Sequence, residues 1–168
     1  RLDYRGYDSW GVAVVSASDI QITKDVGIVK DIPADSLPKS EIGIGHTRWA
    51  THGAVTVVNA HPHLATDGSF ALAQNGIVEN YKELKKNLLE KGYRFMSETD
   101  TEVIVRLIEE ELKTEKDIKL TIEKAFEKLE GRNTIIAITK NKEIIAARNG
   151  SPLVIGKNTQ TNEIYISS

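Results

Sequence analysis

The sequence predicts an α+β domain in which antiparallel sheets are covered by helices. Short β-branched runs dominate the chain up to residue 73, helical spacing of apolar residues follows from Tyr81 to Leu129, and a period-two pattern returns from Asn133. Strands that are grouped before and after helices, with short turns between them, favour antiparallel pairing over alternating βαβ units. A length of 168 residues fits one domain of ordinary size.

Composition removes several functional classes. The chain is 40% hydrophobic and 27% charged, as in globular proteins, and its net charge of -2 gives no reason to expect nucleic acid or an anionic membrane as a partner. No apolar run approaches the length of a membrane span, and no signal peptide opens the chain. The absence of cysteine excludes disulfides and thiolate metal sites and predicts a cytoplasmic location.

The first strands are expected at residues 12–15 and 20–24, as a hairpin, and at residues 41–46, where alternating glycines admit a close neighbour. Residues 29–40 predict only a loop or a short helix. Another short strand is expected at residues 70–73, running into Gln74-Asn75-Gly76.

Three helices are expected next. Tyr81, Leu84 and Leu88 are helically spaced, and Gly92 fits a C-terminal cap. Thr99 and Glu102 have the spacing of a capping box. Apolar stripes mark the second and third helices at Val103, Ile104, Leu107, Ile108 and Leu112, and at Ile118, Ile122, Ala125, Phe126 and Leu129. Four strands then follow at residues 134–139, 143–148, 153–155 and 163–166.

Residues 43–63, GIGHTRWATHGAVTVVNAHPH, contain all four histidines, a tryptophan and a single arginine. A zinc site needs three or four convergent ligands, but the spacing here matches no zinc motif, and no acidic residue lies between His46 and His63. The alternative is that the histidines hydrogen-bond to the backbone of a glycine-rich region. We therefore predict no metal and no cofactor.

Arg48 and Asp100 each have two interpretations. A guanidinium can grip a carboxylate with two parallel hydrogen bonds, although a surface salt bridge is the usual fate of an arginine. Asp100 suits the first turn of a helix, and it can equally hold an ammonium group. Together the two side chains would complement the charged ends of an amino acid.

Asn75-Gly76 is the commonest two-residue hairpin turn. The same pair can also form an oxyanion hole, in which a side-chain amide and a backbone N–H face developing negative charge. Spacing alone does not separate these alternatives. Asn149-Gly150 has the same dipeptide and is expected to be a turn.

Six segments, RLDYRGYDSWG, GIGHTRWATHG, NAHPH, QNGIVENY, SETDTEV and GSPLVIG, occur in the order seen in one enzyme family. Over residues 1–155 the chain resembles the glutaminase domain of the glucosamine-6-phosphate synthases, which are isomerizing glutamine–fructose-6-phosphate aminotransferases. The resemblance implies a class II, N-terminal-nucleophile amidotransferase domain spanning residues 1–168. It also implies the four-layer αββα sandwich of the N-terminal-nucleophile hydrolases.

The resemblance implies roles for individual residues. Arg48 resembles the arginine that grips the α-carboxylate of glutamine, and Asp100 resembles the carboxylate that receives its α-amino group. Thr51 and His52 follow in a loop that closes over bound glutamine. Trp49 resembles a tryptophan that gates ammonia transfer.

The same matching covers the reacting amide. Asn75, through its side chain, and Gly76, through its N–H, resemble an oxyanion-hole pair, and Arg5 resembles an arginine that helps to position the site. The sequence departs from the family at Gln74, where His is usual, and at Val55, where Pro is common.

The family's nucleophile is an N-terminal cysteine, whose thiolate attacks the glutamine amide carbon and releases ammonia before water frees glutamate. This chain has no cysteine. We expect the sequence to be truncated before Arg1, without its first strand and helix, and to stop before the sugar isomerase domain. Such a fragment is predicted to be inactive.

The expected function is hydrolysis of L-glutamine to glutamate and ammonia. In the full enzyme, expected to be a homodimer, the ammonia would convert fructose-6-phosphate to glucosamine-6-phosphate through the isomerase domain. One alternative is a non-catalytic amino-acid-binding module of the same fold, and a metal hydrolase is a third possibility. A Met-Cys-Gly start encoded upstream would favour the enzyme.

Overall fold

The computed structural model describes residues 6–17, 19–29 and 36–168. Arg5 lies outside these residues, so its predicted positioning role stays a prediction. In chain order the elements are β1 (Ser9–Ser16), β2 (Asp19–Val26), β3 (Gly43–Arg48), β4 (His63–Leu64), β5 (Phe70–Gly76), α1 (Tyr81–Glu90), α2 (Asp100–Glu111), α3 (Ile118–Glu127), β6 (Asn133–Thr139), β7 (Ile144–Asn149), β8 (Val154–Lys157) and β9 (Ile164–Ser167).

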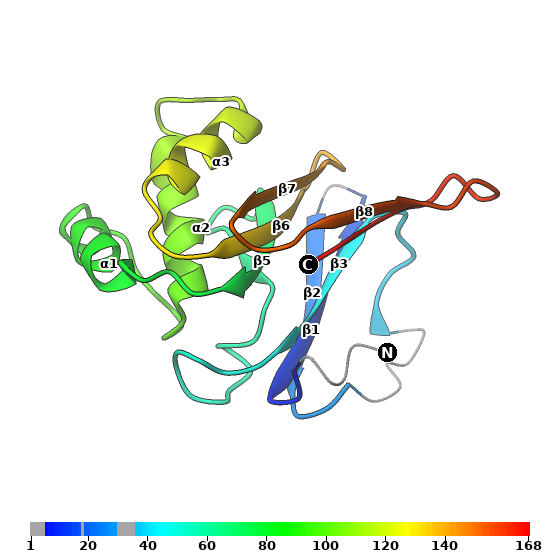
Figure 1. Cartoon of the computed structure of the whole chain (residues 1–168), viewed down its shortest axis with the longest axis horizontal. Helices are drawn as coiled ribbons and strands as arrows, with labels where there is room; N and C mark the ends of the chain where they lie inside the picture. The colour runs from blue at the N-terminus through cyan, green and yellow to red at the C-terminus, as the bar shows by residue number, and fades with distance from the viewer. Residues whose placement is uncertain (1–5, 18, 30–35) are drawn as a thin grey trace.

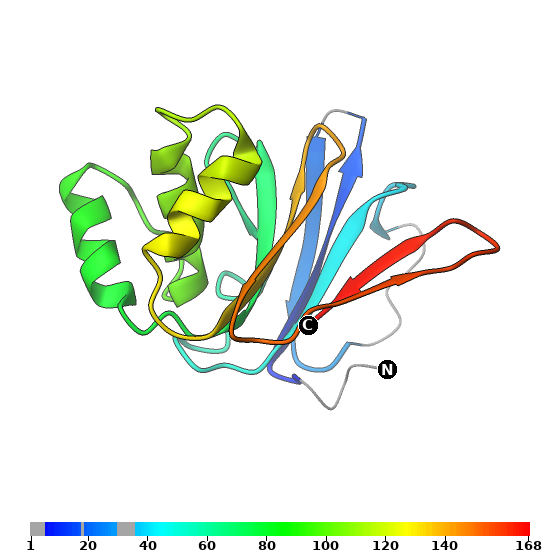
Figure 2. The same ribbon diagram turned by 45° about the horizontal axis from the view of Figure 1, so that its top comes forward.

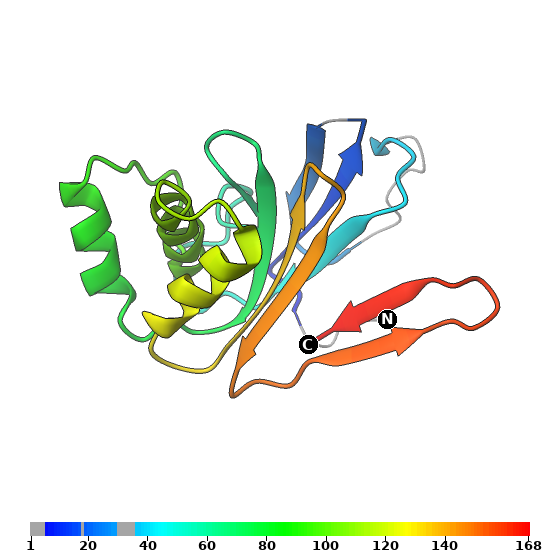
Figure 3. The same ribbon diagram turned by 90° about the horizontal axis from the view of Figure 1, so that it is seen from above.

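Two antiparallel sheets form the centre of the molecule. One has the strand order β2-β1-β3 and the other the order β4-β5-β6-β7. They lie face to face, and the helices α1, α2 and α3 cover the far side of the four-stranded sheet (Figures 1 and 3). The described residues thus form three successive layers of an α+β sandwich, and none of their helices covers the outer face of β1–β3.

Each interface between layers has its own apolar core. Between the helices and the four-stranded sheet, α2 contributes Val103, Ile104, Val105, Leu107 and Ile108, all buried. Between the two sheets, the side chains are smaller, and they come from Ala13, Val15, Ile44, Ala71, Ala73 and Ile138. Small side chains allow the two sheets to approach closely and to pack without leaving a void between them.

The start of α2 matters for the site because Asp100 is its first residue. Thr99 caps the helix, and its hydroxyl accepts from the Glu102 backbone N–H at 3.3 Å. The Glu102 carboxylate does not return to Thr99, as a reciprocal capping box requires. It accepts instead from the backbone N–H groups of Met96 and Ser97, at 2.9 and 2.6 Å, and pairs with Arg106 at 2.8 Å. The chain before the helix is therefore tied to the helix itself.

Most predicted elements are confirmed to within a few residues, including the first hairpin, the three helices and the four strands after Asn133. The two-residue strand β4 was not predicted, since its pairing with β5 leaves no periodic pattern. The hairpin β8–β9 forms a separate sheet that extends away from the sandwich (Figure 2). Within the described ranges, none of the helices has the length and apolar content needed to cross a membrane.

Candidate functional site

A cavity of about 1020 Å³ lies where β3, β5 and the start of α2 meet. It combines residues from both sheets with the helix N-terminus, and its volume is that of a small-molecule site. Seven of the eight predicted site residues line it, the exception being the undescribed Arg5. These seven are Arg48, Trp49, Thr51, His52, Asn75, Gly76 and Asp100.

Arg48 ends β3 and is only 3% exposed. Its guanidinium donates to the carbonyl oxygens of Ala54, at 3.2 Å, and His52. No carboxylate of the described residues lies within ion-pair distance of it, so the surface salt bridge finds no partner among them. Burial lowers the pKa of Arg48, with Asp8, Asp100 and Glu98 acting in the opposite direction. The cation is thus held by neutral carbonyls, and its charge is available to a ligand carboxylate.

Asp100 is 4% exposed, and its Oδ2 accepts from the backbone N–H of Val78 at 2.9 Å. No lysine or arginine among the described residues pairs with it. The nearest titratable partner is His52, whose Nδ1 lies 4.0 Å from Oδ2 and whose ring packs edge-on against Tyr81. The carboxylate lies at the positive end of α2, where an acidic side chain is favoured, and it is placed to receive an ammonium group.

Trp49 and Thr51 lie on the exposed side of the cavity, in the segment that follows Arg48. The Trp49 side chain is 58% exposed and contacts the ring of Tyr7, with 5.4 Å between the ring centroids. A large exposed ring beside a cavity is suited to contact a ligand or a partner surface. Its predicted role in ammonia transfer stays a prediction.

Asn75 and Gly76 are not a hairpin turn. They are the last residues of β5 and pair with Thr134 and Asn133 of β6. Gly76 has a φ of 135°, and a Cβ atom there would lie 2.1 Å from the carbonyl oxygen of Arg132. The nearby Arg132 carbonyl therefore requires glycine at position 76. The preceding Asn75 side chain is exposed at the cavity, and its Nδ2 donates to Ser168. Asn149 likewise ends β7 rather than forming a two-residue turn.

His46, His61 and His63 form a row at the wall of the cavity, where His46 and His61 line it and His61 and His63 are buried. Ring centroids are 4.4 Å apart for His46 and His61 and 5.1 Å apart for His61 and His63. The Nε2 atoms of His61 and His63 hydrogen-bond to the hydroxyls of Thr101 and Thr99, at 2.9 and 3.0 Å. Burial lowers the pKa of His46 to about 4 and that of His63 to about 3. Within the described ranges, no group of three or more ligands could hold a metal ion, so the metal alternative gains no support.

Two sets of residues near the site had no role predicted from the sequence. Gln74 is buried and donates to Asn133 Oδ1 at 2.6 Å, while its own oxygen accepts from Thr101. Glu98 and Asn59 hold the segment after Arg48, as described below. Neither set leaves a periodic pattern in the sequence, because each joins segments that are far apart in the chain.

Comparison with known proteins places the chain in a family. A family profile for the glutamine amidotransferase domain matches residues 46–168. The chain belongs to the glutamine amidotransferase family. It is 47% identical over 164 residues to an isomerizing glutamine–fructose-6-phosphate aminotransferase of Corynebacterium glutamicum, and 46% identical over 161 residues to that of Thermus thermophilus. Each alignment covers 93% of this chain and 26% of the relative.

Two solved structures share the amidotransferase fold. The glutamine phosphoribosylpyrophosphate amidotransferase of B. subtilis, complexed with ADP and GMP, aligns with a TM-score of 0.82 at 26% identity. An allosteric regulatory enzyme of purine biosynthesis aligns with a TM-score of 0.85 at 30% identity. Each covers 98% of this chain, which spans 36% of the longer chain. The expected α+β sandwich of the N-terminal-nucleophile amidotransferases is confirmed.

Proposed function

We propose that this domain binds L-glutamine as the glutaminase part of a glutamine–fructose-6-phosphate aminotransferase. The observation that carries the proposal is a pair of opposite, buried charges that line one cavity and have no ion-pair partners of lysine, arginine or carboxylate type among the described residues. Arg48 would hold the α-carboxylate, and Asp100 would hold the α-ammonium group. Thr51, His52 and Trp49 would then contact the bound amino acid from the segment after β3.

The amide end of glutamine would lie toward Asn75 and Gly76. Attack on the amide carbon places negative charge on its oxygen, which the Asn75 side-chain amide and the Gly76 N–H would stabilise as hydrogen-bond donors. Their position at the end of β5, on the same cavity as Arg48 and Asp100, supports this assignment. Arg5 would help to position the site.

None of the 168 residues is a cysteine, so no thiol nucleophile is present in this sequence. We therefore expect a polypeptide of these residues to bind glutamine without releasing glutamate. The same observation favours a second candidate, a non-catalytic amino-acid-binding module of the same fold. The natural coding sequence upstream of Arg1 separates the two, because a Met-Cys-Gly start supplies the nucleophile.

The chain spans about a quarter of the length of the aminotransferases it matches, at 26% of the relative. The use of ammonia on fructose-6-phosphate is accordingly proposed for a longer protein with an isomerase domain, acting as a homodimer in the cytoplasm. The balanced charge of -2 fits this small-molecule chemistry better than nucleic-acid or membrane binding.

Calorimetric titration of the 168-residue chain tests the binding assignment. L-glutamine should bind, whereas glutaramate, which lacks the α-amino group, and γ-aminobutyramide, which lacks the α-carboxylate, should each bind about tenfold or more weakly. The loss follows from leaving Asp100 or Arg48 buried without its charged partner. Equal affinity for all three compounds, or no binding of L-glutamine, contradicts the proposal.

A further inference from the structure

The segment after β3, residues 49–58, is here termed the clamp loop. It carries the carbonyl groups of His52 and Ala54, which accept from the Arg48 guanidinium, that of Ala54 at 3.2 Å. The direction of the guanidinium therefore depends on where the loop places that carbonyl. Because a planar guanidinium grips a carboxylate only in a narrow range of orientations, the loop position sets the geometry of this end of the site.

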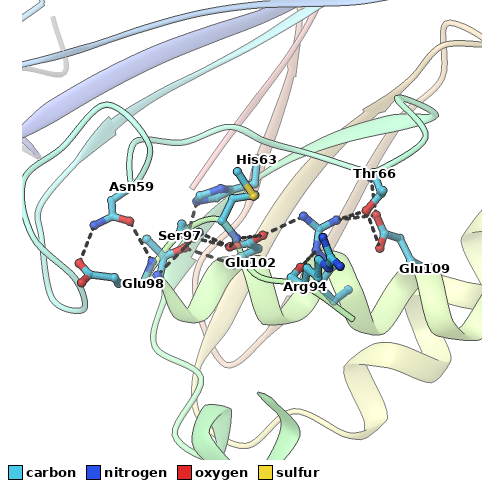
Figure 4. Close-up of polar contacts among 11 residues, drawn as sticks. Asn59, His63, Thr66, Arg94, Ser97, Glu98, Glu102 and Glu109 are labelled. Carbon is cyan, nitrogen blue, oxygen red and sulfur yellow. Dashed lines mark hydrogen bonds and ion pairs between the residues drawn. The ribbon is translucent and has the colours of Figure 1, made fainter. Parts of the chain in front are cut away.

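Glu98 and Asn59 fix the clamp loop from outside the cavity. The Oε2 atom of Glu98 accepts from the Ala54 backbone N–H at 2.9 Å and from Asn59 Nδ2 at 3.1 Å. Asn59 Nδ2 also donates to the Ala54 carbonyl at 2.9 Å, and its Oδ1 accepts from the Glu98 N–H at 2.9 Å. Figure 4 shows Asn59 and Glu98 next to each other and joined by hydrogen bonds.

The packing of the loop on this pair is close. A Cβ atom at Gly53 would lie 2.8 Å from Asn59 Nδ2 and 2.8 Å from Glu98 Cβ, and Gly53 has a φ of 79°. Asn59 is 2% exposed, so its amide has little access to water and depends on these partners. The hydrogen bonds from Ala54 and Asn59 lower the pKa of Glu98, which keeps its side chain anionic at neutral pH.

Glu98 lies two residues before Asp100, so it joins the two charged groups of the site. Arg48 belongs to the three-stranded sheet, whereas Asp100 belongs to the helical layer. We propose that Glu98 and Asn59 are positioning residues that set the separation of Arg48 and Asp100 and so select a ligand with both α-charges. This inference rests on the proposed function of the site and adds two residues to it.

The test uses the 168-residue chain with Glu98→Ala, Glu98→Gln and Asn59→Ala, and with the exposed Glu90→Ala as a matched control. Calorimetry compares L-glutamine, which engages both charged groups, with γ-aminobutyramide, which engages only Asp100. Glu98→Ala and Asn59→Ala should weaken L-glutamine binding about tenfold and leave γ-aminobutyramide within twofold. Glu98→Gln keeps one acceptor for Ala54 and should recover part of the loss.

Hydrogen exchange at the Ala54 amide gives a readout that needs no ligand. Exchange should be slow in the unsubstituted chain and in Glu90→Ala, and at least tenfold faster in Glu98→Ala. Unchanged L-glutamine affinity, an equal loss for both compounds, or unchanged Ala54 exchange overturns the inference and leaves the proposed function intact. Failure of the unsubstituted chain to bind L-glutamine overturns both.

Discussion

The Nδ1 atom of His52 lies 4.0 Å from Oδ2 of Asp100. This approach brings the segment after β3 against the first turn of α2, although the two elements belong to different layers of the sandwich. Among the described residues, His52 Nδ1 has no hydrogen-bond partner, and Asp100 has none of lysine or arginine type. The carboxylate is thus the strongest acceptor left open at this end of the cavity, where we place the ligand's ammonium group.

Replacement of Asp100 by Asn should remove that charge while an oxygen remains to accept from Val78. A hydrogen bond to a charged group contributes about 1.5–3 kcal/mol, so the affinity for L-glutamine should fall roughly 10- to 100-fold. Calorimetry measures the change, with the exposed Glu123→Gln on α3 as the control. The same affinity in Asp100→Asn and the control would remove Asp100 from the site.

Arg48→Lys keeps the positive charge and loses the planar fork. An ammonium group cannot donate to the Ala54 and His52 carbonyls and also grip a carboxylate in the same geometry. We expect L-glutamine affinity to fall about tenfold or more, while the midpoint of thermal unfolding moves by only a few degrees. Retention of full affinity would show that charge alone suffices and that the fork geometry is irrelevant.

Gly76→Ala should destabilise the fold because the new Cβ would meet the Arg132 carbonyl oxygen at 2.1 Å in a backbone conformation with positive φ. The expected loss is about 2–4 kcal/mol in the free energy of unfolding, measured by urea denaturation. Gly156→Ala is the matched control, since nothing lies within 4 Å of a Cβ there. A loss below about 1 kcal/mol at Gly76 would argue against the close strand end described above.

Stability should fall as the pH drops from about 7.5 to about 5.5. Burial lowers the pKa values of His46, His61 and His63, whereas imidazoles in the unfolded chain titrate near 6.5. Below about pH 6.5 these histidines bind protons in the unfolded state but not in the folded state. The stabilisation present above that pH is therefore progressively lost. Each histidine that stays neutral in the folded state lowers the free energy of unfolding by roughly 1.4 kcal/mol for each pH unit below that value. The pKa values of the Glu98 and Glu102 carboxylates are also lowered, but these groups affect stability only at a more acidic pH.

Urea unfolding at the two pH values measures this effect. A decrease of at least about 1.4 kcal/mol is expected. An unchanged free energy of unfolding would mean that the histidine row is protonated in the folded protein or open to water.

The fold was largely predictable because its elements obey local rules. Thr99 capped α2 as expected, the predicted stripe of Val103, Ile104, Leu107 and Ile108 is buried, and Gly92 ends α1 with a φ of 88°. Such features depend on neighbours in the sequence, which a single chain displays directly. Only half of the predicted capping box forms, since the Glu102 carboxylate accepts from the N–H groups of Met96 and Ser97 rather than from that of Thr99.

The site was predictable in its residue types but not in its assembly. Arg48 and Asp100 were identified as a pair, and the structure adds that both are buried on one cavity without an ion-pair partner of lysine, arginine or carboxylate type in the described chain. Asn75-Gly76 could not be assigned by spacing, because a turn and a strand end use the same dipeptide. Glu98 and Asn59 left no signal, since their contacts join segments that only the folded chain brings together.

The most direct test of the account crosses two substitutions with two shortened ligands. Arg48→Lys should abolish most of the preference for L-glutamine over γ-aminobutyramide and keep its preference over glutaramate. Asp100→Asn should do the reverse, because each side chain serves one charged end of the ligand. Calorimetric affinities for the three compounds in the three chains measure this pattern. If both substitutions reduce all three affinities equally, or if neither changes the preferences, Arg48 and Asp100 do not hold the two ends of glutamine.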